Sequence, residues 1–396
     1  MAVAMRPLDS AMPARTGRWR PTVRGVLRGL GRVALGIVLA LVIVAGAGAV
    51  TSIQGTALPA VTGGSAVGRT ELTLTDESRI DPFLSEGRTR ELAVWIWYPA
   101  ADGTSPPAPY YPGAWAALPA GIPFAQDLTK ITTNARQDAV MAGTPPVVVL
   151  QPGLGQPVGN YSALAEDLAS HGYAVVGINE TGSAGTAFPD GHVVPATSAG
   201  NVMADNVDDW YVEADRVTST WAADAQFVVR ALETTPPDIG ALDFTRVAYI
   251  GHSLGGASAF EACSRDDRCT AAIDLDGTLW TSVRETGLSA PHLLVQKGAS
   301  NGCDEFCQRA TTDFDTVMAD GGRQIAIQGA THPNFQDDGL MPAIANHVGL
   351  GPIDGRRMTD IVRDTVRAFL DVNVIGAPAN AFDDTIARYP EITIDR

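Results

Sequence analysis

The sequence predicts an α/β fold in which helices cover both faces of a mostly parallel sheet. Short apolar runs that fit fully buried strands alternate along the chain with amphipathic segments that fit helices. Such alternation is typical of a parallel sheet, because each connection between parallel strands crosses the sheet through a helix. A G-x-S-x-G motif stands between one such strand and the helix that follows it. These observations together favour a single large α/β domain with its chemistry at a strand end.

The first fifty residues differ from the rest in charge and hydropathy. Seven arginines and one acid give residues 1–50 a charge of +6, so the net charge of -16 leaves -22 for the remainder. Residues 33–50 carry no charge. We interpret residues 1–32 as a basic N-terminal segment and residues 33–50 as the h-region of a signal peptide or as an uncleaved signal anchor. Under both interpretations the chain after about Thr51 is exported. It is then either secreted or anchored to the membrane with its folded domain outside.

The predicted elements begin after a small, glycine-bearing linker over residues 51–70. Apolar runs predict strands at 92–98, 145–150, 173–178, 246–250, 271–275, 293–296 and 324–328. Amphipathic or alanine-rich stretches predict helices at 161–170, 208–233, 254–262, 304–318 and 358–370. Residues 101–144 and 181–205 are rich in Pro, Gly or Ser and are predicted to be irregular. The catalytic domain is thus placed at 71–374, with a C-terminal extension at 375–396.

The motif Gly251-His252-Ser253-Leu254-Gly255 is the strongest chemical signal in the chain. A serine hydroxyl is a poor nucleophile near pH 7 unless a tight strand-to-helix turn exposes it beside a base. Gly251 and Gly255 fit that turn, because a Cβ at either position would collide with the neighbouring backbone. The N–H of Leu254 would face a developing oxyanion, aided by the helix N-terminus. We therefore predict that Ser253 is a catalytic nucleophile, against the alternative of a plain glycine turn in the sheet.

A base and an acid are expected downstream in the order Ser, Asp, His. His332 follows a predicted strand and is favoured as the base, whereas His347, His192 and His292 are assigned to the surface or to the opposite sheet end, and His252 to packing beside the turn. Asp276 leaves the strand before Gly277 and is favoured as the acid over Asp274, which we expect to be buried.

The segment Asp274-Leu275-Asp276-Gly277-Thr278 also matches the D-x-D-G-T motif of haloacid dehalogenase-type phosphatases, which need Mg²⁺. Only 64 residues separate Asp274 from the acidic pair that ends at Asp338, too few for the elements that such a fold needs between them. We keep this as a remote alternative and expect neither a metal nor an organic cofactor.

Four cysteines fit an exported chain. Five residues separate Cys263 from Cys269, and three separate Cys303 from Cys307, which suggests two disulfides whose pairing the spacing does not decide. A zinc site and simply buried thiols are the alternatives.

The chain resembles the α/β-hydrolase superfamily, and within it the plasma-type platelet-activating factor acetylhydrolases. The resemblance covers roughly residues 90–370 and rests on WIWYPA, PGLGQPVGNYSALAEDLASHGYAVVGIN, GHSLGGASAF, AAIDLDGTLW and GATHPNF. It implies that Leu154, between Gly153 and Gly155, supplies a second oxyanion N–H. The chain departs from the family in carrying Pro152, after Gln151, where the family usually has a histidine before the G-L-G run.

The resemblance implies Ca²⁺-independent hydrolysis of short or oxidised acyl groups from glycerophospholipids. Another lipase, a polyester hydrolase or an acyltransferase with the same triad is the alternative, and a non-enzymatic envelope protein is a remote one. The acidic balance argues against nucleic acid as a partner and favours zwitterionic lipids or soluble esters over anionic bilayers. A membrane contact is expected through the N-terminal segment if it is uncleaved, and the oligomeric state is not predicted.

Overall fold

The computed structural model describes residues 36–38, 43–85, 87–118, 124–298, 305–319 and 321–395. The chain divides into two units, residues 1–50 and residues 51–396. Within the first unit, residues 36–38 and 43–50 are helical. Among the described residues, we find no helix with the length and apolar character needed to span a bilayer. Residues 1–35 and 39–42 lie outside the described part, and with them the predicted basic segment and much of the predicted h-region.

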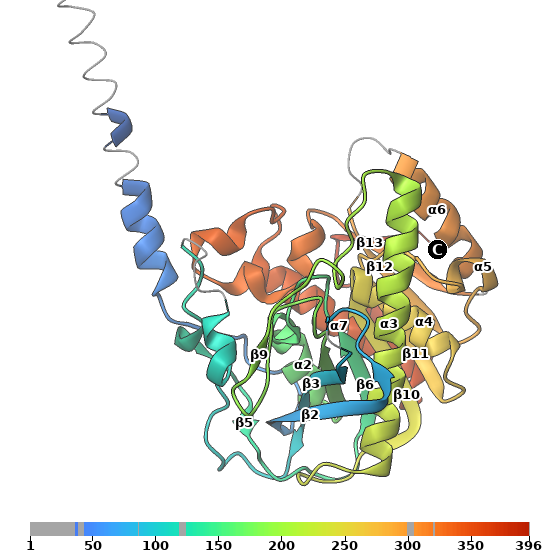
Figure 1. The fold of residues 1–396 in the computed structure, drawn as a ribbon, viewed down its shortest axis with the longest axis horizontal. Coiled ribbons are helices and arrows are strands. Elements are labelled where there is room, and N and C mark those ends of the chain that lie inside the picture. Colours follow the sequence, from blue (N-terminus) through green and yellow to red (C-terminus); the bar gives the residue numbers. More distant parts are fainter. Residues whose placement is uncertain are drawn as a thin grey trace, which may run out of the picture. The chain divides into compact units, whose positions relative to one another are not determined.

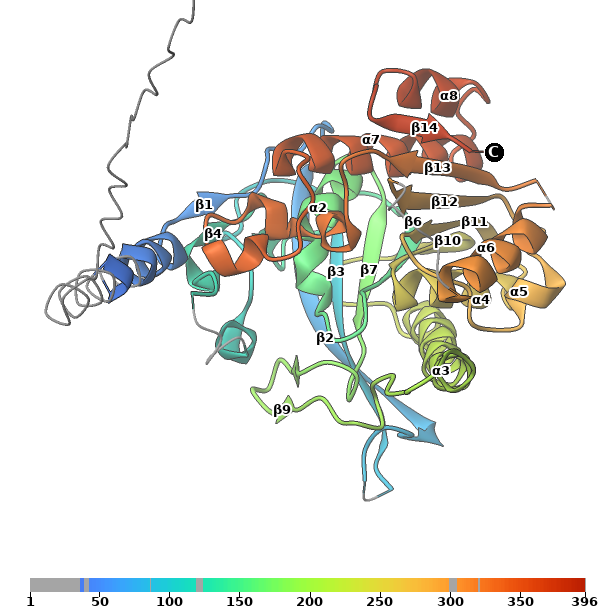
Figure 2. The same cartoon turned by 90° about the horizontal axis from the view of Figure 1, so that it is seen from above.

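A ten-stranded sheet forms the frame of the second unit (Figures 1 and 2). Its strand order is β14-β13-β12-β11-β10-β6-β7-β3-β2-β5. The strands are β2 (Ala66–Ile80), β3 (Thr89–Ala100), β5 (Arg136–Gln137), β6 (Pro146–Gln151), β7 (Ala174–Asn179), β10 (Asp243–His252), β11 (Cys269–Leu275), β12 (His292–Lys297), β13 (Arg323–Ile327) and β14 (Ile392–Ile394). The strands from β7 to β13 in this order are parallel, whereas β3 is antiparallel to β2 and β7, and β14 is antiparallel to β13. The predicted mostly parallel sheet is confirmed.

Helices cover both faces of this sheet (Figure 2). One face packs on α2 (Ser162–Ser170) and α7 (Gly355–Asn373), and the other on α3 (Val207–Thr234), α4 (Leu254–Ser264) and α6 (Glu305–Met318). Successive side chains of β6 serve the two faces in turn, since Val148 and Leu150 join the first cluster and Val147 and Val149 the second. A strand buried on both faces has no polar positions, which explains why its sequence is a continuous apolar run.

Two segments that the sequence analysis set outside the domain are part of it. The predicted linker 51–70 contains the start of β2, and the N–H of Thr62 donates to Asp167 in α2 at 2.8 Å. The predicted extension 375–396 forms α8 (Ala381–Ile386) and β14, which pairs with β13 and so covers that edge of the sheet. The folded unit thus includes residues on both sides of the predicted bounds 71–374, namely the start of β2 and the short elements α8 and β14, which carry little apolar sequence.

The strand register brings several loops to one edge of the sheet. Gly251 in β10 lies beside Gln151 in β6 and Asp274 in β11. The chain therefore leaves these three parallel strands at the same level, and the residues that follow each strand meet at the carboxyl edge. This is where open α/β sheets bind their ligands.

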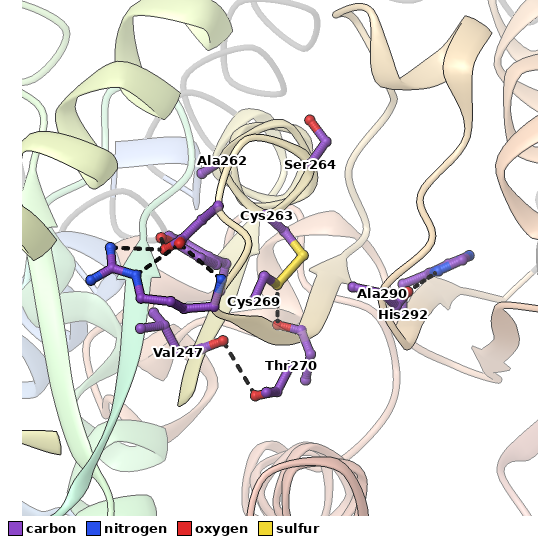
Figure 3. The surroundings of a disulfide bond; sticks show 12 residues. Val247, Ala262, Cys263, Ser264, Cys269, Thr270, Ala290 and His292 are labelled. Carbon is purple, nitrogen blue, oxygen red and sulfur yellow. Dashed lines mark hydrogen bonds and ion pairs between the residues drawn. A yellow bond between two sulfur atoms is a disulfide. The ribbon is translucent and has the colours of Figure 1, made fainter. Parts of the chain in front are cut away.

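One disulfide links Cys263, at the end of α4, to Cys269, at the start of β11 (Figure 3). It closes the turn between these two elements, with the two Cα atoms 5.3 Å apart. One of the two predicted disulfides is thus present, between cysteines that are close in sequence. Cys303 lies outside the described residues, so the second, with Cys307, stays a prediction.

Candidate active site

Ser253 occupies a tight turn between the end of β10 and the start of α4. Its backbone has φ 57° and ψ -124°, a conformation that non-glycine residues rarely adopt and that turns its side chain out of the sheet. The turn requires glycine on both sides. A Cβ on Gly251 would lie 2.0 Å from the carbonyl oxygen of Gly255, and one on Gly255 would lie 2.3 Å from that of Pro152. The strain at Ser253 is thus held by close backbone packing on either side.

Three of the predicted site residues meet in one line of hydrogen bonds. The Oγ of Ser253 lies 2.9 Å from Nε2 of His332, and Nδ1 of His332 lies 2.6 Å from Oδ2 of Asp276. The carboxylate can only accept, so Nδ1 carries the ring proton and Nε2 is left to accept the serine hydroxyl. His332 begins the 3-10 turn η4 (His332–Phe335), and 44% of its side chain is exposed. A base oriented in this way, and open to a ligand, can take the proton from the serine.

Asp276 is held from three sides. Its backbone N–H donates to Val295 in β12 at 2.7 Å, and its Oδ1 accepts the backbone N–H of Lys297 at 2.9 Å. Burial opposes ionisation of this carboxyl, but the hydrogen bond from His332 and the positive charge of Lys297 outweigh it and lower its pKa below the usual value. Asp276 is therefore a carboxylate, able to fix the orientation and tautomer of His332. Lys297 is a member of the site that the sequence analysis did not include.

Asp274 occupies a different environment in the same loop. It is fully buried beneath the turn, where its Oδ1 accepts the N–H of Gly277 at 2.7 Å. Burial, and to a lesser degree the neighbouring charge of Asp276, raise the pKa of its carboxyl well above the usual value. The expectation that Asp274 is a buried, hydrogen-bonded strand residue is confirmed. Asp337, from the acidic pair of the phosphatase alternative, instead bonds to Tyr110 and to the start of α2.

The two predicted oxyanion amides flank Ser253. Leu254 is the first residue of α4, and Leu154 belongs to the loop after β6, which we call the oxyanion loop (residues 152–156). Among the described residues, neither N–H has a hydrogen-bond acceptor. The loop lies against the turn, since a Cβ on Gly153 would lie 3.0 Å from Nδ1 of His252 and 3.5 Å from the Cβ of Ser253. Both amides are thus free to donate to a ligand.

The other histidines play other parts. The ring of His292 is buried between carbonyl groups, and His347 donates to the carbonyl of Met341. His192 stacks on Phe188 and contacts Asp190 and Glu91. His252 is buried beside the turn, as expected, and makes two hydrogen bonds there that are described below.

A cavity of about 480 Å³ opens beside the oxyanion loop. Its described lining includes Gly155 and Gln156 of that loop, the aromatic rings of Tyr111 and Trp115, and one acid, Asp338. Lysine and arginine are absent from this described lining. Burial raises the pKa of Asp338 above the usual value. The described lining offers an anionic group no positive partner. The aromatic wall of the cavity comes from the segment 101–144, whose irregular sequence gave no sign of it.

A sheet of this strand order, with Ser253 on a tight glycine-flanked turn at the end of its central strand β10, has the α/β-hydrolase fold. The chain is an α/β-hydrolase, and it resembles the platelet-activating factor acetylhydrolases. A family model described as "Platelet-activating factor acetylhydrolase, isoform II" matches residues 238–377, which include the turn and the His332 loop.

Individual relatives agree with this resemblance. A probable 1-alkyl-2-acetylglycerophosphocholine esterase of Arthroderma benhamiae is 24% identical over 277 residues, which are 62% of this chain and 65% of that protein. The platelet-activating factor acetylhydrolase of Cavia porcellus is 25% identical over 372 residues, 81% of this chain and 79% of its own length. The chain thus spans slightly less than two thirds of the fungal relative.

A solved structure of similar fold is the ferulic acid esterase from Streptomyces cinnamoneus. The TM-score is 0.74 at 29% sequence identity, and the match covers 87% of this chain and 100% of the other. By their names, all three proteins act on carboxylic esters.

Proposed function

We propose that this protein is a carboxylic ester hydrolase in which Ser253 is the nucleophile, His332 the general base and Asp276 the orienting acid. The observation that carries the proposal is the pair of hydrogen bonds at His332, 2.9 Å to the serine oxygen and 2.6 Å to the carboxylate. Both lie within the reach needed for proton transfer. The names of the relatives, which are esterases, support the same reaction.

The reaction follows from these positions. His332 takes the proton of Ser253 as Oγ attacks the ester carbonyl, and the oxyanion that forms accepts hydrogen bonds from the N–H groups of Leu154 and Leu254. His332 then gives the proton to the leaving alcohol, and the acyl group stays on Ser253. Water, deprotonated by His332, attacks this acyl-enzyme, and His332 returns the proton to Oγ of Ser253 as the bond to the acyl group breaks and the acid leaves. Nucleophile, base and oxyanion donors all come from the chain itself.

The names of the two curated relatives favour short acyl esters of glycerophospholipids as the substrate class. A second candidate is an ester of an aromatic acid, because the ferulic acid esterase aligns over its whole length and the cavity beside the oxyanion loop has an aromatic wall. A described lining with one acid and neither lysine nor arginine disfavours an anionic group in that cavity under both candidates.

Replacing the nucleophile tests the activity. Ser253→Ala is expected to abolish turnover of p-nitrophenyl acetate and labelling by a fluorophosphonate probe. Ser258→Ala is the matched control, because Ser258 lies in the same helix and its buried hydroxyl has no partner among the described residues. Labelling and turnover that persist in Ser253→Ala contradict the proposal. A wild-type protein that folds but neither labels nor turns over supports the non-enzymatic alternative.

The substrate class is tested by comparing kcat/KM for three esters. These are a 2-acetyl ether glycerophosphocholine, its long-acyl counterpart and methyl ferulate. A preference for the first supports a phospholipid acetylhydrolase, and a preference for the last supports the aromatic alternative. Preference for the long-acyl ester, or faster transfer to an added alcohol than to water, supports a lipase or an acyltransferase.

We infer export from the basic-then-apolar pattern of residues 1–50, and the disulfide of Cys263 and Cys269 fits an oxidising compartment. Fusing residues 1–50 to an alkaline phosphatase that is active only outside the cytoplasm tests this. The matched control carries Val38→Arg and Val44→Arg, which interrupt the apolar run. Equal reporter activity from both fusions contradicts export.

A further inference from the structure

His252 connects three parts of the active site through its ring. It is the last residue of β10, directly before Ser253, and its side chain is buried. Its Nδ1 lies 2.8 Å from the hydroxyl of Tyr161, at the start of α2, and its Nε2 lies 3.1 Å from the backbone carbonyl of His332. The rings of His252 and His332 are also close, with centroids 4.5 Å apart.

The donor and the acceptor of each of these hydrogen bonds follow from the chemistry of the partners. A backbone carbonyl can only accept, so Nε2 of His252 carries a proton and donates to His332. The N–H of Gly153 donates to the Tyr161 oxygen at 2.9 Å, which leaves the hydroxyl proton of Tyr161 to donate to Nδ1 of His252. Three hydrogen bonds thus connect the oxyanion loop, through Tyr161 and His252, to the backbone carbonyl of His332. Each donor and each acceptor in this series is used once.

This arrangement requires a neutral His252. The groups that face it are Tyr161 directly before α2, His332 from η4, Asp276 after β11 and Lys297 at the end of β12. Burial first, and then the charge of His332, lower the pKa of His252 to about 3, and the attraction of Asp276 does not reverse this. His252 therefore stays uncharged when His332 becomes an imidazolium, and adds no like charge beside it.

We propose that Tyr161 and His252 are positioning residues that hold the oxyanion loop and His332 in register with each other around Ser253. Tyr161 fixes Gly153, one residue before the Leu154 amide, and His252 fixes the backbone from which the base projects. The inference rests on the proposed function and deepens it. A shift of the oxyanion loop or of His332 by a fraction of an ångström misaligns groups that act together only in the transition state. Such a shift is therefore expected to lower kcat more than it changes KM.

The experiment removes single hydroxyl or ring contacts and measures kcat and KM per fluorophosphonate-titrated site. Tyr161→Phe is expected to lower kcat at least tenfold and to leave KM within twofold. Tyr98→Phe is the matched control, because it removes a buried hydroxyl that donates to the carbonyl of Ala139 at 2.7 Å, away from the site. The control should keep kcat within twofold of wild type.

Variants of His252 separate positioning from folding. His252→Gln can keep a donor at the place of Nε2 and is expected to retain more activity than His252→Phe, which keeps neither bond. Adding Tyr161→Phe to His252→Phe should lower kcat by a smaller factor than Tyr161→Phe does alone, because the Tyr161–His252 bond is already lost and only the bond from Gly153 remains to be removed.

The outcomes distinguish this inference from the proposed function. If the wild-type protein hydrolyses esters but Tyr161→Phe matches Tyr98→Phe in kcat, the positioning role of Tyr161 and His252 is wrong, whereas the proposed roles of Ser253, His332 and Asp276 are unaffected. A loss that is confined to KM or to the titratable fraction also overturns it. An inactive wild-type protein overturns the proposed function itself.

Discussion

The Nζ of Lys297 lies 3.0 Å from Oδ2 of Asp276, the same oxygen that accepts the proton of His332. The carboxylate that would stabilise a charged His332 is thus shared with a fixed positive charge. Lys297 also holds this carboxylate with its backbone N–H, which no side-chain substitution removes. The lysine side chain can therefore be tested for its charge without displacing the acid.

Lys297→Met is expected to move the acidic limb of the kcat/KM profile to higher pH, by up to about one unit. Lys297 helps to lower the pKa of Asp276, so without the lysine this carboxyl takes up a proton, and loses its ability to orient His332, at a higher pH. The effect is modest because 44% of the Lys297 side chain is exposed and water and salt screen it. The profile is measured at low ionic strength, with the exposed Lys130→Met as control. A limb that stays in place or moves to lower pH contradicts this role.

Asp276→Asn is expected to lower kcat by ~10³-fold or more, the scale seen when a triad carboxylate becomes an amide. An amide has one acceptor oxygen, whereas Asp276 accepts from both the Lys297 backbone and His332. The proton on Nδ1 of His332 therefore loses its partner, or the loop shifts. Kinetics with p-nitrophenyl acetate and a thermal melt check this.

Asp274→Asn provides the matched control for that experiment. Burial raises the pKa of Asp274 well above its usual value and so favours its neutral acid, which an amide of the same shape resembles; kcat should stay within about tenfold. If instead Asp274→Asn is the more damaging of the two, the assignment of the acid to Asp276 is wrong.

The sequence predicted the parts of this site that depend on local pattern. The parallel strands are apolar runs because both faces are buried, and Ser253 is marked by glycines that the turn requires. The choice of Asp276 over Asp274 followed from where the chain leaves a strand. These inferences needed only neighbours along the chain.

The remaining features depend on contacts that are distant in sequence. Lys297 reaches Asp276 from 21 residues away, and Tyr161 reaches His252 from 91. Lys297 lies outside the segments that carry the resemblance, and Tyr161 lies within one of them but had no role assigned to it. The long strand β2 alternates polar and apolar residues, and β14 is three residues long, so neither produced a continuous apolar signal. β14 is the edge strand beside β13, and β2 lies between β3 and the two-residue edge strand β5, so the place of each is set by strand pairing.

Removing the disulfide is expected to lower stability but not activity. Replacing both Cys263 and Cys269 by Ser frees a short loop of the unfolded chain, and a loop of this length is worth about 2 kcal/mol. The disulfide joins the far end of α4 to the start of β11, away from Ser253 at the other end of that helix. Urea unfolding and kcat are measured on the same samples. A loss of kcat at unchanged stability contradicts the prediction.

Asp337 is expected to make stability fall with pH in a defined window. Burial raises the pKa of its carboxyl to about 8, despite hydrogen bonds from Ala163 and Tyr110. The folded protein keeps this proton up to about pH 8, whereas the unfolded chain releases it above about pH 4. Because the folded state binds more protons in between, the contribution of Asp337 to stability is fully present below about pH 4 and is lost as the pH rises to 8.

Asp337→Asn removes this dependence, because an amide can accept from Ala163 and donate to the Tyr110 oxygen without ionising. Relative to wild type, the variant should gain on the order of 1–4 kcal/mol of unfolding free energy at pH 7.5 and little at pH 4.5. Urea titrations at both pH values measure the difference in unfolding free energy between variant and wild type. The contributions of all other buried carboxyl groups are the same in both proteins and cancel in this difference. A gain of equal size at both pH values would mean that packing, and not the proton on Asp337, sets the change.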